Sequence, residues 1–232
     1  VQSIVFRYGL TTSFPEPVHR EIASASFSIS EDEIAARTDL REWPIVTIDG
    51  ENARDFDDAV CVQKKEGHYE LFVSIADVAS YVQAGTAIDQ EAHSRATSVY
   101  FPDRAIPMLP EALSNGICSL NPNEDRLTKT VAMEINGKGE VVRTRFFNSV
   151  IRSSERMTYT AVRRVLVDHD PEHLERYRDL VNQFKLMEEL ALLMYESRRA
   201  RGNLDFDLPE AEIILDLQGM PENIVRAERN IA

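Results

Sequence analysis

Residues 45–60 have the sequence IVTIDGENARDFDDAV, in which an acidic turn separates two apolar runs. Four aspartates fall within ten positions of this segment: Asp49, Asp55, Asp57 and Asp58. The flanking apolar runs predict that the turn joins two strands of a hydrophobic core. Carboxylates this close repel one another unless a cation lies between them, because two unit charges about 4 Å apart cost on the order of 4 kcal/mol at an effective dielectric constant of about 20.

The turn offers only oxygen ligands, which suit Mg²⁺ or Mn²⁺. A solvated turn or a simple Ca²⁺ site is the alternative for a segment this rich in aspartate. An EF-hand does not fit, because a loop that opened at Asp55 would have Val60 at its sixth position, where glycine is required. The residues alone leave open whether the site is structural or catalytic.

The composition is that of an ordinary globular protein, with 232 residues and 43% hydrophobic content. A formal net charge of −13 argues against nucleic-acid binding by bulk electrostatics, so an RNA-binding role would need a local basic channel or separate basic domains. Cys61 and Cys118 lie in apolar surroundings without CxxC spacing, which predicts reduced core thiols in a cytoplasmic protein. We expect neither a membrane span nor a signal peptide, because no sufficiently long apolar run and no leader occur.

Local patterns predict the secondary structure. Residues 1–43 carry helical signals, including the apolar positions Val18 and Ile22 and a capping box at residues 30–33. Strands are predicted at residues 45–48, 59–64, 69–75 and 97–102, in a hairpin of 128–135 with 140–150, and in a pair around Gly219. Helices are predicted at residues 89–96, 158–167 and 172–200, the last one capped by Gly202.

Three blocks of sequence occur in a fixed order. They are TIDG with ARDFDDAV in residues 47–60, IADV at residues 75–78, and TSVYFP at residues 97–102 running on to LSNGICSLNP at residues 113–122. Together they resemble the RNB catalytic domain of the ribonuclease II and ribonuclease R exoribonucleases, and their residues are more similar to those of ribonuclease R. The resemblance implies an α+β fold with a mixed, mainly antiparallel sheet and surrounding helices. Residues 1–43 would be a helical lead-in or linker, and residues 44–232 the N-terminal part of the catalytic domain.

The resemblance also implies an activity: processive, Mg²⁺-dependent hydrolysis of single-stranded RNA from the 3′ end, releasing nucleoside 5′-monophosphates, with Mn²⁺ as an alternative metal. Asp49, Asp55, Asp57 and Asp58 match the family's four active-site aspartates. Asp49 and Asp58 are expected to be the most direct metal ligands. Asp55 and Asp57 are expected to complete the metal site and to be the catalytic residues. Two cations about 3.5–4 Å apart would suit this chemistry, because they activate water and clamp the phosphate.

Three aromatic residues are implied to contact RNA. Tyr100 matches the family tyrosine that stacks on the 3′-terminal base, and stacking suits an enzyme that accepts every nucleotide. Phe206 resembles the partner aromatic of that clamp, and Tyr159 resembles a further RNA contact. Core packing is the alternative for each ring.

The chain also departs from the family pattern. That pattern continues into a helix with a catalytic glutamate and later into an arginine-rich segment that holds the scissile phosphate, and cold-shock and S1 domains flank it. These parts are missing from the 232 residues, so we expect a C-terminally incomplete catalytic domain. The alternative function is a catalytically incomplete RNA-binding or regulatory module with the same fold. The sequence does not indicate an oligomeric state.

Overall fold

The computed structural model describes residues 1–25, 27–204, 211–216, 218 and 220–226, apart from the side chain of Glu212. The chain forms two compact units. The helical unit comprises residues 1–27, 78–116 and 207–229, and the sheet unit comprises residues 28–77, 117–206 and 230–232. The predicted domain boundary at residue 43 therefore does not coincide with the boundary between the units.

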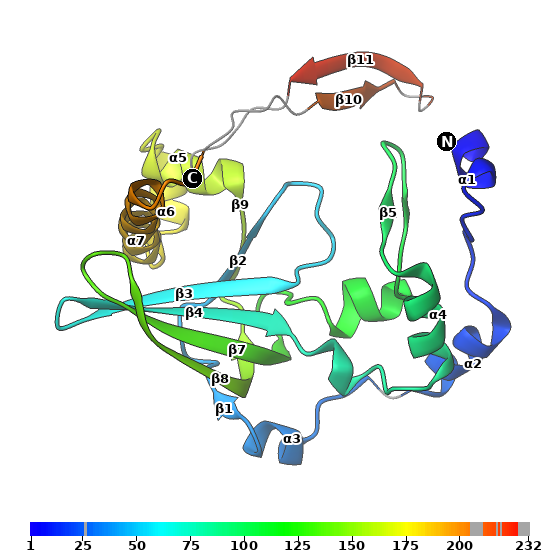
Figure 1. The fold of residues 1–232 in the computed structure, drawn as a ribbon, viewed down its shortest axis with the longest axis horizontal. Coiled ribbons are helices and arrows are strands. Elements are labelled where there is room, and N and C mark those ends of the chain that lie inside the picture. Colours follow the sequence, from blue (N-terminus) through cyan, green and yellow to red (C-terminus); the bar gives the residue numbers. More distant parts are fainter. Residues whose placement is uncertain (26, 205–210, 217, 219, 227–232) are drawn as a thin grey trace. The chain divides into compact units, whose positions relative to one another are not determined.

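The sheet unit is built on a seven-stranded sheet with the strand order β1-β8-β7-β4-β3-β2-β9 (Figure 1). The strands are β1 (Thr38–Asp39), β2 (Val46–Asp49), β3 (Asp58–Lys65), β4 (His68–Ala76), β7 (Asp125–Ile135), β8 (Val141–Arg152) and β9 (Glu155–Thr158). The neighbours from β2 to β8 are antiparallel, whereas β1 runs parallel to β8 and β9 runs parallel to β2. The predicted mixed, mainly antiparallel sheet with surrounding helices is confirmed.

Turn chemistry explains the hairpin of β3 and β4. Glu66 and Gly67 connect the strands, and both have positive φ, 49° and 83°. Two successive residues of positive φ match the right-handed twist of the flanking strands, and the glycine adopts this conformation without steric cost. The turn therefore sets the register Lys65–His68 at the end of the hairpin, which continues to the pair Asp58–Ile75.

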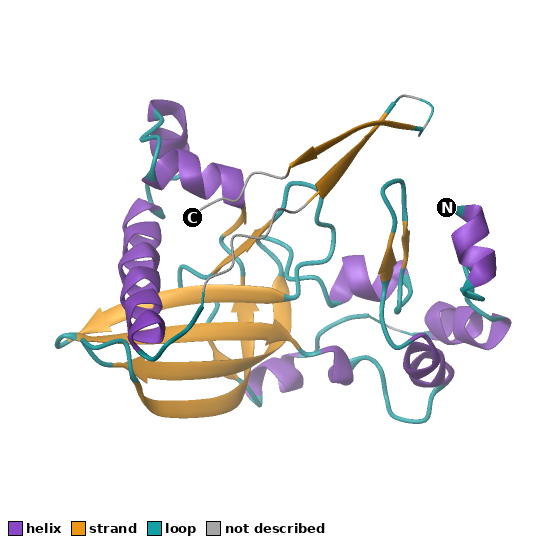
Figure 2. Ribbon diagram, turned by 45° about the horizontal axis from the view of Figure 1, so that its top comes forward, coloured by secondary structure: helices purple, strands orange, loops and turns teal. Residues whose placement is uncertain are grey.

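The helices of the sheet unit are α3 (Glu31–Ala35), α5 (Tyr159–Leu166), α6 (Pro171–Arg176) and α7 (Val181–Ala200). Helix α7 lies against the sheet (Figure 2). Its Leu190 packs on Val62 of β3, and its fully buried Phe184 belongs to a cluster with Val46 of β2 and Met157 of β9. Packing against α7 therefore holds β2 and β3, the two strands that the acidic turn connects.

Two predictions about helices in this unit are wrong in detail. Residues 172–200 form two helices instead of one, because Tyr177 ends α6 and packs into the same core as Phe184. The change of direction lets both helices bury side chains against β2 and β9. The lead-in is not helical throughout, since Thr38 and Asp39 form β1. The capping box of α3 is confirmed: Ser30 Oγ accepts from Glu33 N at 3.2 Å, and the Glu33 carboxylate accepts from Ser30 N at 3.0 Å.

The helical unit contains short elements. They are α1 (Gln2–Arg7), α2 (Glu16–Ser24), the 3₁₀ turn η1 (Val78–Ser80), α4 (Ala87–Arg95), the hairpin β5 (Val99–Tyr100) with β6 (Ala105–Ile106), and the hairpin β10 (Ala211–Leu215) with β11 (Pro221–Arg226). The π-helical segment η2 (Ala112–Ile117) leads out of this unit. The predicted pair of C-terminal strands is confirmed, although Gly219 itself lies outside the described residues. Among the described helices, none is both long and apolar enough to cross a membrane.

Candidate active site

The four aspartates lie at one end of two neighbouring strands. Asp49 is the last residue of β2 and Asp58 is the first residue of β3, while Asp55 and Asp57 lie in the turn between them, the light-blue loop of Figure 1. The two strands are antiparallel neighbours with Val46 opposite Val60, so their paired backbones hold both ends of the turn. The structure thus places the four aspartates that the sequence predicts as a site in one turn and at its two ends.

The carboxylates influence one another electrostatically. Partial desolvation raises the pKa of Asp57, and the negative charges of the other three aspartates raise it further. Desolvation and then the charge of Asp49 raise the pKa of Asp58. A cation among these groups would favour their charged forms and relieve the repulsion.

The donor set fits a divalent cation by its chemistry. All four ligand candidates are carboxylates, which are hard oxygen donors of the kind that Mg²⁺ and Mn²⁺ prefer. In the part of the chain that the structure describes, no three acidic, histidine or cysteine side chains converge closely enough to enclose a metal ion. Metal binding would therefore require these side chains to turn toward the cation, starting from backbone positions that are already neighbours.

Parts of the three sequence blocks meet in the middle of the turn, at Phe56 and Asp57. Phe56 is 4% exposed, its N–H donates to Ser119 Oγ at 3.0 Å, and its carbonyl accepts from Leu120 N at 2.8 Å. The adjacent Asp57 carbonyl accepts from Ala76 N at 2.9 Å. Segments far apart in the chain therefore bind the backbone on which Asp55 and Asp57 are carried.

A buried ion pair supports the same end of the sheet. Asp77, which is 3% exposed, binds Arg37 at 2.7 Å and lies 3.4 Å from Lys129 Nζ. Arg37 also donates to the carbonyl of Thr128 at 3.2 Å. The charge of Asp77 is balanced by Arg37 and Lys129, so Asp77 is a structural residue and not a fifth member of the acidic turn.

Two of the predicted RNA-contact residues have exposed rings. Tyr159, the first residue of α5, is 42% exposed, and its pKa is raised by desolvation and by the charges of Asp49 and Asp58. Tyr100 lies on β5 of the helical unit and is 69% exposed. The exposure of both rings argues against core packing as their role. Phe206 lies outside the described residues.

Comparison with known proteins gives a family. Residues 37–232 match the model of the RNB domain. The chain belongs to the RNB domain family. The resemblance found in the sequence is thus confirmed, and the residues of the acidic turn lie inside the matched region.

Relatives of this RNB domain carry the name ribonuclease R. The Aquifex aeolicus protein "Ribonuclease R" is 45% identical over 233 residues, covering 100% of this chain and 33% of that protein. A solved structure of Mycoplasma genitalium RNase R in complex with ribose methylated single-stranded RNA has a TM-score of 0.89 at 29% identity, covering 99% of this chain and 35% of that chain. The RNB domain described here therefore spans about a third of the length of these relatives.

The fold alone is shared more widely. The structure of yeast Ssd1, described as a pseudonuclease, has a TM-score of 0.62 at 19% identity over 74% of this chain. An RNB-like fold is therefore not by itself a sign of nuclease activity.

One residue of this RNB domain that contacts the acidic turn was not predicted. Arg156, on β9, donates two hydrogen bonds from Nη2, to the carbonyls of Glu51 at 2.9 Å and Ala53 at 3.0 Å. The local sequence gives no signal for this role, because β9 is four residues long and its pairing partner, β2, is distant in the chain.

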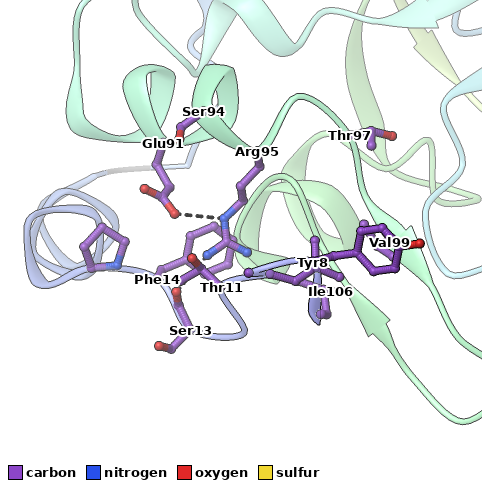
Figure 3. Close-up of a pocket in the computed structure, with 13 residues that line it drawn as sticks. Tyr8, Thr11, Ser13, Phe14, Glu91, Ser94, Arg95, Thr97, Val99 and Ile106 are labelled. Carbon is purple, nitrogen blue, oxygen red and sulfur yellow. Dashed lines mark hydrogen bonds and ion pairs between the residues drawn. The ribbon is translucent and has the colours of Figure 1, made fainter. Parts of the chain in front are cut away.

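A hollow of about 550 Å³ in the helical unit is a second place to look for a ligand (Figure 3). Arg95 lines this hollow. Its guanidinium donates to the carboxylate of Glu91 at 2.9 Å, to the Pro107 carbonyl at 3.0 Å and to the Ser13 carbonyl at 2.7 Å. The same group lies 3.9 Å from the centre of the Phe14 ring. Because Arg95 is engaged on all sides, it ties the N-terminal segment to α4 and does not offer a charge to an anionic ligand.

Proposed function

We propose that the complete protein carrying this chain is a 3′-to-5′ exoribonuclease that hydrolyses single-stranded RNA processively and releases nucleoside 5′-monophosphates. One observation carries the proposal: residues from all three sequence blocks contact one another at Phe56 and Asp57, in the turn that carries the four aspartates between β2 and β3. Membership of the RNB family and the name of the relatives support it. The solved relative with single-stranded RNA supports RNA as the substrate.

We assign the metal site to the acidic turn, with Mg²⁺ as the cation and Mn²⁺ as a substitute. Asp49 and Asp58 are the most direct ligands, and Asp55 and Asp57 are the catalytic residues that complete the set. When bound, a divalent metal supplies Lewis-acid activation of water and stabilisation of the leaving oxygen. The chain itself contributes four carboxylates whose backbones are held by paired strands and by the contacts of Phe56.

We assign the RNA contacts to three aromatic residues. Tyr100 stacks on the 3′-terminal base with Phe206 as its partner, and Tyr159 contacts the nucleotide close to the metal site. Stacking is worth about 1–3 kcal/mol per base and tolerates every base, which suits an enzyme that removes nucleotides one after another. The position of Tyr159 beside Asp49 and Asp58 supports its role. The buried free thiols of Cys61 and Cys118 support a cytoplasmic location.

The test uses the complete protein, Mg²⁺ and a single-stranded RNA labelled at its 5′ end. We expect shortening from the 3′ end, release of nucleoside 5′-monophosphates and a short labelled end product. Adding excess unlabelled RNA after the reaction starts should leave the shortening of bound strands unchanged if degradation is processive. Internal cleavage, or release of nucleoside diphosphates, would contradict the proposed reaction.

The second candidate is a catalytically incomplete RNA-binding or regulatory module. It would keep the fold and the acidic turn without the hydrolytic reaction, since a fold does not by itself fix an activity. The same experiment separates the two functions, because such a module would retain the labelled RNA without shortening it at any Mg²⁺ or Mn²⁺ concentration.

A further inference from the structure

We propose that Arg156 is a positioning residue, which holds the acidic turn in the shape that lets its aspartates bind a divalent cation. The inference rests on the proposed function in one respect, namely that the acidic turn is the metal site. The two hydrogen bonds that Arg156 donates to the turn go to backbone carbonyls, those of Glu51 and Ala53. Its influence on the metal would therefore pass through the backbone of the turn.

The first part of the turn is shaped by the guanidinium. Nη2 of Arg156 bridges the carbonyls of Glu51 and Ala53, two residues apart, at 2.9 Å and 3.0 Å. Between them the chain is already bent, since Ala53 N donates to Gly50 O at 3.1 Å. A single nitrogen that binds two carbonyls fixes their separation and their direction, and so sets the curvature of the backbone between Asp49 and Asp55.

The second part of the turn is held by stacking. The guanidinium lies 4.7 Å from the centre of the Phe56 ring, which is itself buried and bound through its backbone to Ser119. Cation–π attraction of this kind holds a guanidinium over an aromatic ring, and it strengthens where water is excluded. Arg156 therefore contacts the turn on both sides of Asp55, at residues 51 and 53 before it and at residue 56 after it.

The strand that carries Arg156 is a rigid support. Arg156 lies opposite Thr47 in the parallel pair of β9 with β2, and the next residue, Met157, is fully buried beneath α7. A group on a packed strand holds its position more exactly than a group on a loop. The same strand β2 ends in Asp49, so Arg156 links the turn to the strand from which the turn starts.

The arrangement leaves hydrogen bonds unmade. In the described part of the protein, Nε of Arg156 is buried without a hydrogen-bond partner, and so is Oγ1 of Thr47 on the neighbouring strand. A buried donor without a partner destabilises the folded state. Sheet stability alone does not explain an arginine at this position, whereas its contacts with Glu51, Ala53 and Phe56 of the turn do.

Lysine cannot replace this group. Its ammonium has no planar face to stack on Phe56 and no rigid fork of donors. Arg156→Lys therefore keeps the charge and most of the length of the side chain but loses the geometry, and Arg156→Met keeps only the packing of the stem. Arg145→Met is the matched control, because Arg145 lies on β8, pairs with Glu70 at 2.6 Å and is not among the residues that bind the turn.

The experiment compares the complete protein with these three variants. Mn²⁺ binding is measured by calorimetry without RNA, the Mg²⁺ concentration for half-maximal RNA degradation is determined, and RNA affinity is measured in a chelator. We expect Arg156→Met to weaken Mn²⁺ binding and to raise the half-maximal Mg²⁺ concentration by about 10- to 100-fold, as removal of a group that orients metal ligands does. Activity should return at high Mg²⁺, RNA affinity should not change, Arg156→Lys should lie between, and Arg145→Met should match the unaltered protein.

Several outcomes would overturn the inference. Unchanged Mn²⁺ binding by a folded Arg156→Met protein is one, and a loss of activity that high Mg²⁺ does not restore is another, because it would indicate general structural damage. If Arg156→Met does not fold, unchanged Mn²⁺ binding by Arg156→Lys overturns it. An unaltered protein that binds Mn²⁺ but does not degrade RNA would contradict the proposed function alone, since Mn²⁺ binding by the variants still decides the role of Arg156. An unaltered protein that binds no Mn²⁺ would overturn both.

Discussion

Asp49 and Thr158 are partners in the parallel pairing of β2 with β9. Each ends its strand, and Thr158 then caps α5, since its Oγ1 accepts from Ala161 N at 3.1 Å. Tyr159 follows at once, which is why its ring senses the charges of Asp49 and Asp58. One strand pair thus carries a candidate metal ligand, a candidate RNA contact and, two residues before Thr158, the arginine that binds the turn.

Asp57→Asn should remove hydrolysis while leaving RNA binding largely intact. The change removes one negative charge from the metal site, whereas RNA affinity comes mainly from contacts elsewhere. We expect a fall in kcat on the order of 10²–10³-fold or more, measured by release of mononucleotides from the complete protein at saturating RNA. Asp179→Asn, at an exposed position just before α7, serves as the control. Full activity of Asp57→Asn would refute the assignment.

Tyr100→Ala should alter the length of the end product more than the rate of hydrolysis. The exposed ring is proposed to position the terminal nucleotide, so its loss should leave a longer residual oligonucleotide. The measurement is the product ladder on a poly(A) substrate, with Tyr100→Phe as the control that keeps the ring. A ladder identical to that of the unaltered protein would show that Tyr100 does not clamp the base.

The metal-free protein should gain stability from Asp57→Asn at neutral pH. The pKa of Asp57 is raised in the folded state, so folding is favoured below the unfolded-state pKa and this advantage is lost as the pH rises through the folded-state pKa. At pH 7 the charged group repels its neighbours, and removing its charge should raise the melting temperature by a few degrees in a chelator. The difference should disappear as the pH falls below the ordinary aspartate pKa. Mg²⁺ should then stabilise the unaltered protein more than the variant.

Asp77→Ala should destabilise the sheet unit strongly. The change leaves the guanidinium of Arg37 buried without its carboxylate partner, and breaking such a pair costs about 3–5 kcal/mol. Arg152→Met breaks the more exposed pair with Asp125 and should cost no more than about 1 kcal/mol. The measurement is the urea midpoint for each complete protein. Equal midpoints for the two variants would contradict the structural role given to Asp77.

Much of the sheet could be predicted because its information is local. The hairpin of β3 and β4 has alternating apolar residues and a glycine in its turn, and the acidic turn stands out by composition. β1 and β9 could not be predicted, because they are too short for a periodic pattern and are stabilised by strands far away in the chain. Arg156 was missed for the same reason. The family and the fold are confirmed, while the roles of the four aspartates and of Tyr100, Tyr159 and Phe206 stay predictions.

The buried position of Phe56 limits where residues can be inserted into the turn. Surface loops commonly tolerate insertions, but this turn is bound at its middle by Ser119 and Leu120 and continues directly into a register in which Asp58 faces Ile75. One extra residue after Phe56 would either displace the buried ring or shift β3 by one position against β4. Such a shift would exchange the buried and exposed faces of β3. An extra residue near Asn52, before Phe56, would leave the register of β3 unchanged but would alter the bend that Arg156 bridges between Glu51 and Ala53. Insertions on the two sides of Phe56 should therefore disturb different parts of the structure, the strand register on one side and the bend of the turn on the other.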